Sequence, residues 1–154
     1  MTHLKAGDKA PEINTTDQNG NSVSSEQLKG QKYVLYFYPK DNTPGCTNEA
    51  KNLRDFYDEF KEKGYEVIGL SPDSEASHKK FAEKHNLPFP LLTDTDKEIM
   101  KAFGVWGEKK NFGKVYDGVH RTTFLIDEKG TITEVFKKVK TKEHAEQIFA
   151  CINE

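Results

Sequence analysis

One segment of the chain combines residue types that can do covalent chemistry. The segment Pro39–Cys46 reads PKDNTPGC and follows the apolar run Tyr33–Tyr38, which is typical of a buried strand. Active sites of open α/β sheets lie at such carboxyl ends of strands. A helix is expected to begin at Pro44, which puts Cys46 in its first turn, beside unpaired backbone N–H groups and the positive end of the helix dipole. Both features favour the nucleophilic thiolate.

The expected helix also sets the direction of the cysteine. Cys46 shares one helical face with Ala50, Leu53 and Tyr57, so its side chain should point toward the protein under partial cover. A cysteine in that position can be a small buried filler, because unpaired cysteines are among the most buried residues. The preceding Pro44-Gly45 turn and the helix start favour a reactive residue instead.

Composition narrows the class of protein. The chain has 154 residues, 31% charged and 34% hydrophobic, with a formal charge of −2. This length fits a single domain, 1–154. The charge balance gives no reason to expect a nucleic-acid or membrane partner, and the longest apolar run, six residues, is too short to span a bilayer. The N-terminal residues lack a signal-peptide core, so a cytoplasmic location is expected.

Cysteine and histidine usage argues against two other classes. The two cysteines, Cys46 and Cys151, are too few for a secreted disulfide scaffold, and they form no CxxC pair. The five histidines are scattered and are expected at the surface rather than in a metal site. No metal site is therefore expected.

Hydrophobic periodicity predicts an α/β sandwich around a mixed sheet. Parallel strands joined by crossover helices are followed by an antiparallel hairpin and a last helix. The expected elements are an N-terminal hairpin over 13–24, a helical turn at 25–29, strands at 33–38, 67–71, 91–93, 122–126 and 131–136, helices at 44–63, 75–86, 96–103 and 141–152, and a long loop at 104–120.

The reactive segment also carries a family resemblance. Pro39, Thr43 and Cys46 match the Pro-x-x-x-Thr-x-x-Cys signature of peroxiredoxins, and the longer string FYPKDNTPGCTNE is similar to the bacterioferritin comigratory protein, or Q-type, branch. The likeness continues through VIGLSPD at 67–73, FGVWG at 103–107 and RTTFLID at 121–127. The resemblance implies a thioredoxin-like fold and an antioxidant thiol peroxidase that reduces hydrogen peroxide and organic hydroperoxides. The sulfur itself does the redox work, so no cofactor is implied.

The resemblance assigns a role to each matching residue. Cys46 attacks the peroxide and becomes a sulfenic acid, while Arg121 holds the thiolate and stabilises the charge that moves onto the leaving oxygen. The Thr43 hydroxyl hydrogen-bonds the thiolate and the peroxide, and Pro39 shields the sulfur from water. Glu49 orients Arg121 or the loop. Taken alone, Arg121 would be an ordinary charge at a strand edge and Thr43 an ordinary helix cap.

The chain departs from the branch at one position. Many Q-type members carry a resolving cysteine five residues after the peroxidatic one, where this chain has Lys51. Two routes stay open: an external thiol reduces the sulfenic acid directly, or Cys151 resolves it. The one-cysteine route is the expectation, with thioredoxin or a small-molecule thiol as reductant, and a monomer is favoured.

Two other functions fit the same fold. A thiol-disulfide oxidoreductase would normally use CxxC, which is missing here, and it would catalyse the reduction of insulin. A non-catalytic binding module would keep its activity after Cys46→Ser.

Overall fold

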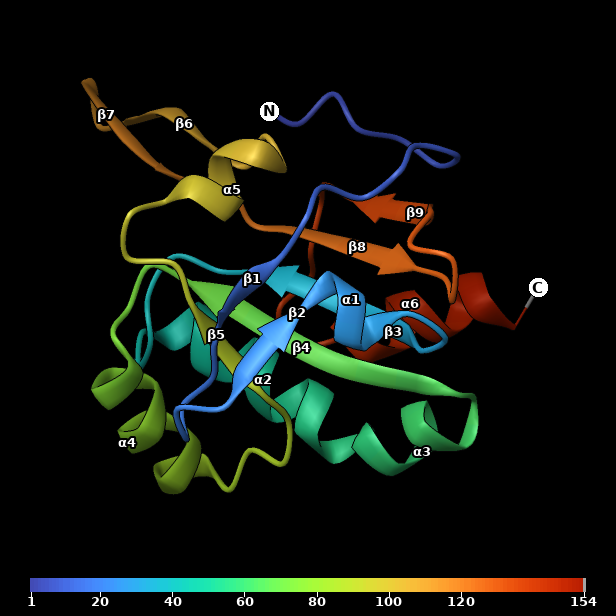
Figure 1. Ribbon diagram of the computed structural model, residues 1–154. Coiled ribbons are helices and arrows are strands. Elements are labelled where there is room, and N and C mark those ends of the chain that lie inside the picture. Colours follow the sequence, from blue (N-terminus) through green and yellow to red (C-terminus); the bar gives the residue numbers. More distant parts are fainter. Residues whose placement is uncertain (154) are drawn as a thin grey trace.

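A five-stranded mixed sheet forms the centre of the computed structural model, which describes residues 1–153. The strand order is β5–β4–β3–β8–β9 (Figure 1). Strands β3 and β5 lie parallel to β4, β8 is antiparallel to β3, and β9 is antiparallel to β8. The bounds are β3 (Lys32–Phe37), β4 (Tyr65–Ser71), β5 (Leu91–Thr93), β8 (Thr122–Ile126) and β9 (Ile132–Phe136).

Strand β3 divides the hydrophobic core into two layers. Val34 and Tyr36 belong to the cluster on one face, and Leu35 and Phe37 to the cluster on the other. Successive side chains of a strand point to opposite faces, so a strand buried on both faces needs the continuous apolar run seen in the sequence. The sheet is therefore covered on both sides, as predicted.

Four helices supply the layer that contains Cys46. Their apolar residues join Val34 and Tyr36 in one buried cluster, and Figure 1 shows them along one side of the sheet. They are α2 (Pro44–Asp55), α3 (Tyr57–Glu62), α4 (Glu75–His85) and α6 (His144–Ile152).

The other face is covered by smaller elements. Residues of α5 (Glu98–Ala102), α1 (Ser25–Leu28) and the N-terminal segment pack with Leu35 and Phe37. The predicted N-terminal hairpin is present as β1 (Asn14–Thr16) and β2 (Ser22–Ser24). Helices on both faces of a mixed sheet confirm the predicted α/β class.

The long helix predicted over 44–63 is interrupted. Helix α2 ends at Asp55 and α3 begins at Tyr57, because Phe56 leaves the α conformation (φ −108°, ψ 10°). The Phe56 ring packs against Phe149 of α6, with ring centroids 5.8 Å apart. The last two helices also start later than predicted, at Glu98 and His144.

The prediction of a loop over 104–120 is wrong. Strands β6 (Trp106–Asn111) and β7 (Lys114–Val119) form an antiparallel hairpin that projects from the body of the protein in Figure 1. Its turn residues Phe112 and Gly113 both have positive φ, as a type I′ turn requires. Most of its side chains are exposed or half-buried on both faces, so the sequence shows no period-two alternation.

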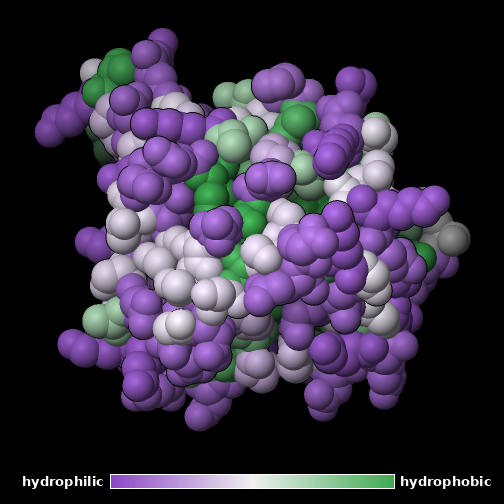
Figure 2. All heavy atoms as spheres, in the orientation of Figure 1, coloured by the Kyte–Doolittle hydropathy of each residue, from purple (hydrophilic) through white to green (hydrophobic). Residues whose placement is uncertain are grey.

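Few large apolar side chains are exposed among the described residues. The face shown in Figure 2 is mostly hydrophilic, with hydrophobic residues at the tip of the β6–β7 hairpin and in a second area near the centre of the face. Phe112, at that tip, is 96% exposed. Within residues 1–153, no helix is long and apolar enough to cross a membrane.

Candidate active site

Cys46 lies where β3 has ended and α2 begins. Pro44 opens the helix, Cys46 is its third residue, and the first helical hydrogen bond runs from the Thr47 amide to the Thr43 carbonyl at 2.8 Å. The amides before Thr47 are therefore at the positive end of the helix without an intrahelical acceptor. Cys46 is only 1% exposed and joins Ala50 in the core, as its helical face predicts.

Arg121 and Glu49 complete a charged group around the sulfur. Arg121 Nη2 donates to Cys46 Sγ at 3.3 Å, and Arg121 Nη1 donates to Glu49 Oε1 at 2.6 Å. Glu49 is one turn along α2 from the cysteine, and Arg121 directly precedes β8, so two distant parts of the chain meet here. A guanidinium held against a sulfur stabilises negative charge there.

The Glu49 carboxyl is strongly affected by its surroundings. Glu49 is fully buried, and burial raises its pKa to about 7, against the opposing effect of the Arg121 charge and hydrogen bond. Its second oxygen, Oε2, has no hydrogen-bond partner among residues 1–153. Burial lowers the pKa of Arg121, but the charges of Glu49 and Cys46 outweigh that effect and raise it. Near neutral pH, protonation of Glu49 therefore changes the charge beside Arg121.

His144 extends this group into α6. It is fully buried, and its Nδ1 donates to Gln147 Oε1 at 2.9 Å while its Nε2 accepts from the Thr123 hydroxyl at 2.7 Å. Burial lowers the pKa of His144 to about 4, despite the bond to Gln147. The imidazole is therefore neutral at pH 7, and its 3.8 Å separation from Glu49 Oε2 is not an ion pair at that pH.

Thr43 does not donate to the sulfur in this structure. Its hydroxyl donates to the Lys40 carbonyl at 2.7 Å and makes no capping bond to α2. The prediction that this hydroxyl hydrogen-bonds the thiolate is therefore corrected, because its single hydrogen is used within the loop. The oxygen lone pairs can still accept from a peroxide O–H. Pro39 is half-buried at the start of the same loop.

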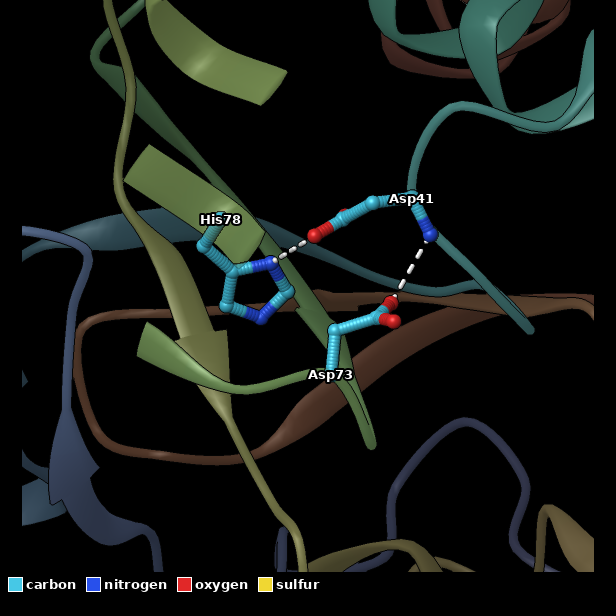
Figure 3. A group of neighbouring side chains, drawn as sticks. All are labelled: Asp41, Asp73 and His78. Carbon is cyan, nitrogen blue, oxygen red and sulfur yellow. Dashed lines mark hydrogen bonds and ion pairs between the residues drawn. The ribbon is translucent and has the colours of Figure 1, made fainter. Parts of the chain in front are cut away.

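A second cluster, of two buried residues and the half-buried Asp73, fixes the loop from the other side. Asp41, Asp73 and His78 come from three separate segments and point toward one another in Figure 3. Asp41 Oδ2 lies 2.7 Å from His78 Nδ1, and the Asp41 amide donates to Asp73 Oδ2 at 2.8 Å. Asp41 follows β3 and Asp73 follows β4, so the carboxyl ends of two parallel strands are tied together.

Further hydrogen bonds saturate this cluster. The Tyr38 hydroxyl donates to Asp41 Oδ1 at 2.6 Å, and the Ser77 hydroxyl donates to Asp41 Oδ2 at 2.8 Å. His78 Nε2 donates to the Leu92 carbonyl at 2.9 Å. The two carboxyl groups and the imidazole offer possible metal-ligand atoms within 4.8 Å of one another. Since these atoms are already engaged inside the protein, the cluster acts as an anchor for the loop that ends at Cys46.

The prediction that the histidines lie at the surface is wrong for two of them. His78 and His144 are both 0% exposed. A signal for His78 was present, because it precedes Phe81 and Ala82 by three and four residues and so lies on the buried face of α4. Arg121 and Thr123 are two apart and so point to one face of the sheet, but no local pattern pairs them with residues of α2 and α6.

Cys151 lies at the opposite end of the sheet from Cys46. Its thiol donates to Glu134 Oε2 at 3.2 Å, and its charge acts on Tyr65, the first residue of β4. Cys46 instead follows the last residues of β3, a strand that runs parallel to β4. A disulfide needs Cα atoms within about 7 Å, less than the length of either strand.

Comparison with known proteins agrees with this geometry. Residues 6–135 match the model of the AhpC/TSA family. The chain belongs to the AhpC/TSA family. It is 50% identical over 141 residues to a Bacillus subtilis protein named Peroxiredoxin Bcp, covering 92% of this chain and 90% of the relative. It is 47% identical to Peroxiredoxin Bcp of Escherichia coli over 154 residues, covering 100% of this chain and 99% of the relative.

Comparison with solved structures also finds peroxiredoxins. Xanthomonas campestris Peroxiredoxin Q superposes with a TM-score of 0.86 at 35% identity, covering 92% of this chain and 89% of that one. A mutant of Xylella fastidiosa PrxQ superposes with a TM-score of 0.92 at 32% identity, covering 99% and 98%. The predicted peroxiredoxin of the bacterioferritin comigratory protein, or Q-type, branch and its thioredoxin-like fold are thus confirmed. The protein is a thiol peroxidase, an enzyme that uses peroxide substrates and thiol reductants.

Proposed function

We propose that Cys46 is the peroxidatic cysteine and that Arg121, Glu49, Thr43 and Pro39 form its site. The substrates are hydrogen peroxide and organic hydroperoxides. A solved relative, the bacterioferritin comigratory protein of Xanthomonas campestris, is described with alkyl peroxide reduction activity. The 3.3 Å contact between Arg121 Nη2 and Cys46 Sγ carries the assignment, because it puts a fixed positive charge on the only sulfur at the start of α2.

The reaction begins with attack of the Cys46 thiolate on one peroxide oxygen. A sulfur–oxygen bond forms, the oxygen–oxygen bond breaks, and the sulfur becomes a sulfenic acid. The leaving oxygen takes a proton and departs as water or an alcohol. Negative charge moves from the sulfur to that oxygen during the attack. Arg121 therefore stabilises the charge both on the thiolate and on the leaving oxygen. The Thr43 oxygen accepts from the peroxide O–H, and Pro39 keeps water from the sulfur.

Intact-mass measurement tests this assignment directly. The reduced protein is treated with one equivalent of hydrogen peroxide, and Cys46→Ser is the control. A rapid gain of one oxygen in the parent but not in the control supports the proposal. Reaction no faster than that of an ordinary thiol overturns it.

We further propose that an external thiol, thioredoxin or a small molecule, recycles the sulfenic acid. Lys51 occupies the position of the usual resolving cysteine, and the contacts of Cys151 lie at the other end of the sheet. The same mass experiment tests this point, since a loss of two hydrogens would show a Cys46–Cys151 disulfide and overturn the one-cysteine route.

The remaining expectations about the whole chain are proposals as well. We propose a single domain over 1–154, supported by one sheet with a core on each face. A monomer in the cytoplasm is proposed with it. Size-exclusion chromatography with light scattering tests the oligomeric state, and cell fractionation tests the location.

A further inference from the structure

A pocket of about 350 Å³ lies beside Arg121 and is lined mainly by positive charge. Lys109, Lys137 and Lys138 line it together with Arg121 and His120. No carboxylate among the described residues lines it. The whole chain has a formal charge of −2, so this excess of positive charge is local. A concave, positively lined site raises the local concentration of anions.

The three lysines of this pocket are not neutralised by ion pairs. Within residues 1–153, none of them lies within salt-bridge distance of a carboxylate. Lys109 Nζ donates to the Val119 carbonyl at 2.9 Å, which holds its ammonium in place without cancelling its charge. The Lys138 carbonyl accepts from Gln147 Nε2 at 3.1 Å, so the backbone beneath the exposed lysines is tied to α6.

Arg121 joins this pocket to the reactive sulfur. Its guanidinium contacts Cys46 Sγ at 3.3 Å, and Arg121 is also one of the residues that line the pocket, with its side chain 22% exposed. A molecule whose negative groups bind these lysines therefore lies next to the residue that contacts Cys46 Sγ. The pocket volume is at the lower end of the range for small-molecule sites.

We propose that this pocket takes a low-molecular-weight thiol that carries carboxylates, and that this thiol reduces the Cys46 sulfenic acid. The inference rests on the proposed function and specifies its reductant. It follows from two observations: the chain has Lys51 at the usual resolving position, and the anion-attracting pocket shares Arg121 with the site.

The reduction proceeds in two balanced steps. The thiolate of the first thiol attacks the Cys46 sulfur, a sulfur–sulfur bond forms, and the sulfenic oxygen leaves as hydroxide, which takes a proton to give water. A second thiolate then attacks the sulfur of the bound thiol in this mixed disulfide. Cys46 leaves as the thiolate, and the two small thiols leave as their disulfide.

A charge-reversal experiment tests the pocket. The sulfenic acid is formed with one equivalent of hydrogen peroxide in the parent, in Lys137→Glu/Lys138→Glu, and in the matched control Lys9→Glu/Lys129→Glu. The control makes the same change of net charge at exposed positions that do not line this pocket. Each protein is mixed with glutathione or 3-mercaptopropionate (anionic), 2-mercaptoethanol (neutral) or cysteamine (cationic). Remaining sulfenic acid is trapped with dimedone and measured by mass.

The expected result depends on the charge of the thiol. The pocket variant should slow reduction by the two anionic thiols about tenfold, because two exposed charge contacts are reversed. It should leave the neutral thiol unchanged and accelerate cysteamine, and added salt should shrink the effect. Equal slowing of all four thiols, no slowing, or turnover by thioredoxin alone would overturn the inference. Failure to form the sulfenic acid at all would instead overturn the proposed function.

Discussion

The two buried histidines have different partners on the two sides of Cys46. Both ring nitrogens of His78 lie against oxygen atoms. Nδ1 lies against the Asp41 carboxylate, and Nε2 lies against the Leu92 carbonyl. His144 has one acceptor, Gln147 Oε1, and one donor, the Thr123 hydroxyl. His78 therefore lies between two acceptor groups, whereas His144 lies between one acceptor and one donor. Equal burial therefore does not make the two histidines equivalent, because their partners differ.

The comparison also separates anchoring from chemistry. The His78 cluster touches the loop through Asp41, whereas the His144 side approaches the sulfur through Glu49 and Arg121. Disruption of the first cluster should mainly cost stability. Disruption of the second should mainly change the reaction of Cys46.

The largest expected effect is on the stability of His78→Leu. This change leaves the buried Asp41 carboxyl with only the Tyr38 and Ser77 hydroxyls and leaves the Leu92 carbonyl without its donor. It should lower the free energy of unfolding by about 3 kcal/mol or more, because buried polar groups on both sides of the ring lose a bond. The matched variant His144→Leu removes neutral hydrogen bonds only and should cost about 1–3 kcal/mol. Urea denaturation at pH 7 measures both. Equal losses would contradict the anchoring role assigned to His78.

Arg121→Ala should have the largest effect on the reaction. Removal of the donor to Cys46 Sγ should slow sulfenic acid formation about 10²–10³-fold, in line with the loss of one charge-stabilising donor. Stopped-flow mixing with hydrogen peroxide measures this rate. Arg54→Ala is the control, because Arg54 contacts Asp55 and the His85 carbonyl at a distance from the sulfur. A similar loss in both variants would contradict the assigned role of Arg121.

Glu49→Gln should change the pH dependence of stability. Burial raises the folded-state pKa of Glu49 to about 7, above the ordinary value of 4.5. As pH rises, the unfolded chain therefore releases the Glu49 proton before the folded protein does. The contribution of Glu49 to the free energy of unfolding then falls between pH 4.5 and 7, by up to about 1.4 kcal/mol per pH unit. The variant cannot ionise and should lose that slope. Urea titrations across this range measure the difference, and identical slopes would refute the prediction.

His144→Leu should act in the acid range with the opposite sign. The folded-state pKa of His144 is lowered to about 4 from 6.5, so the unfolded chain binds the proton first as pH falls. Stability from this group is therefore lost as pH falls from 6.5 to 4. The parent should lose more stability than the variant over that interval. A parallel decline of the two proteins would contradict a neutral His144.

The smallest effect is expected at Thr43. Thr43→Ala removes the hydrogen bond to the Lys40 carbonyl and an acceptor for the peroxide, and should slow sulfenic acid formation about tenfold. Thr43→Ser keeps the hydroxyl and should restore the rate. If serine reacts as slowly as alanine, the methyl group and not the hydroxyl is what matters.

Several features were predictable because their signals are local. The strand-to-helix turn before Cys46, its inward direction and the two-sided burial of β3 all follow from patterns within about ten residues. The β6–β7 hairpin was missed since its exposed faces show no alternation. His144 was missed because its buried neighbours, Thr123 and Glu49, lie far from it in the chain.

The sequence by itself determined the α/β class and a reactive cysteine at a helix start, because apolar periodicity and the Pro-Gly turn act over short distances. Only the tertiary structure decided which groups surround the sulfur. Arg121 lies 75 residues from Cys46 in the chain, and His78 lies 37 from Asp41. Such pairs form only when the whole sheet has set its register and its helices have packed. Packing also decided that His144 is neutral at pH 7, since its burial lowers its pKa to about 4.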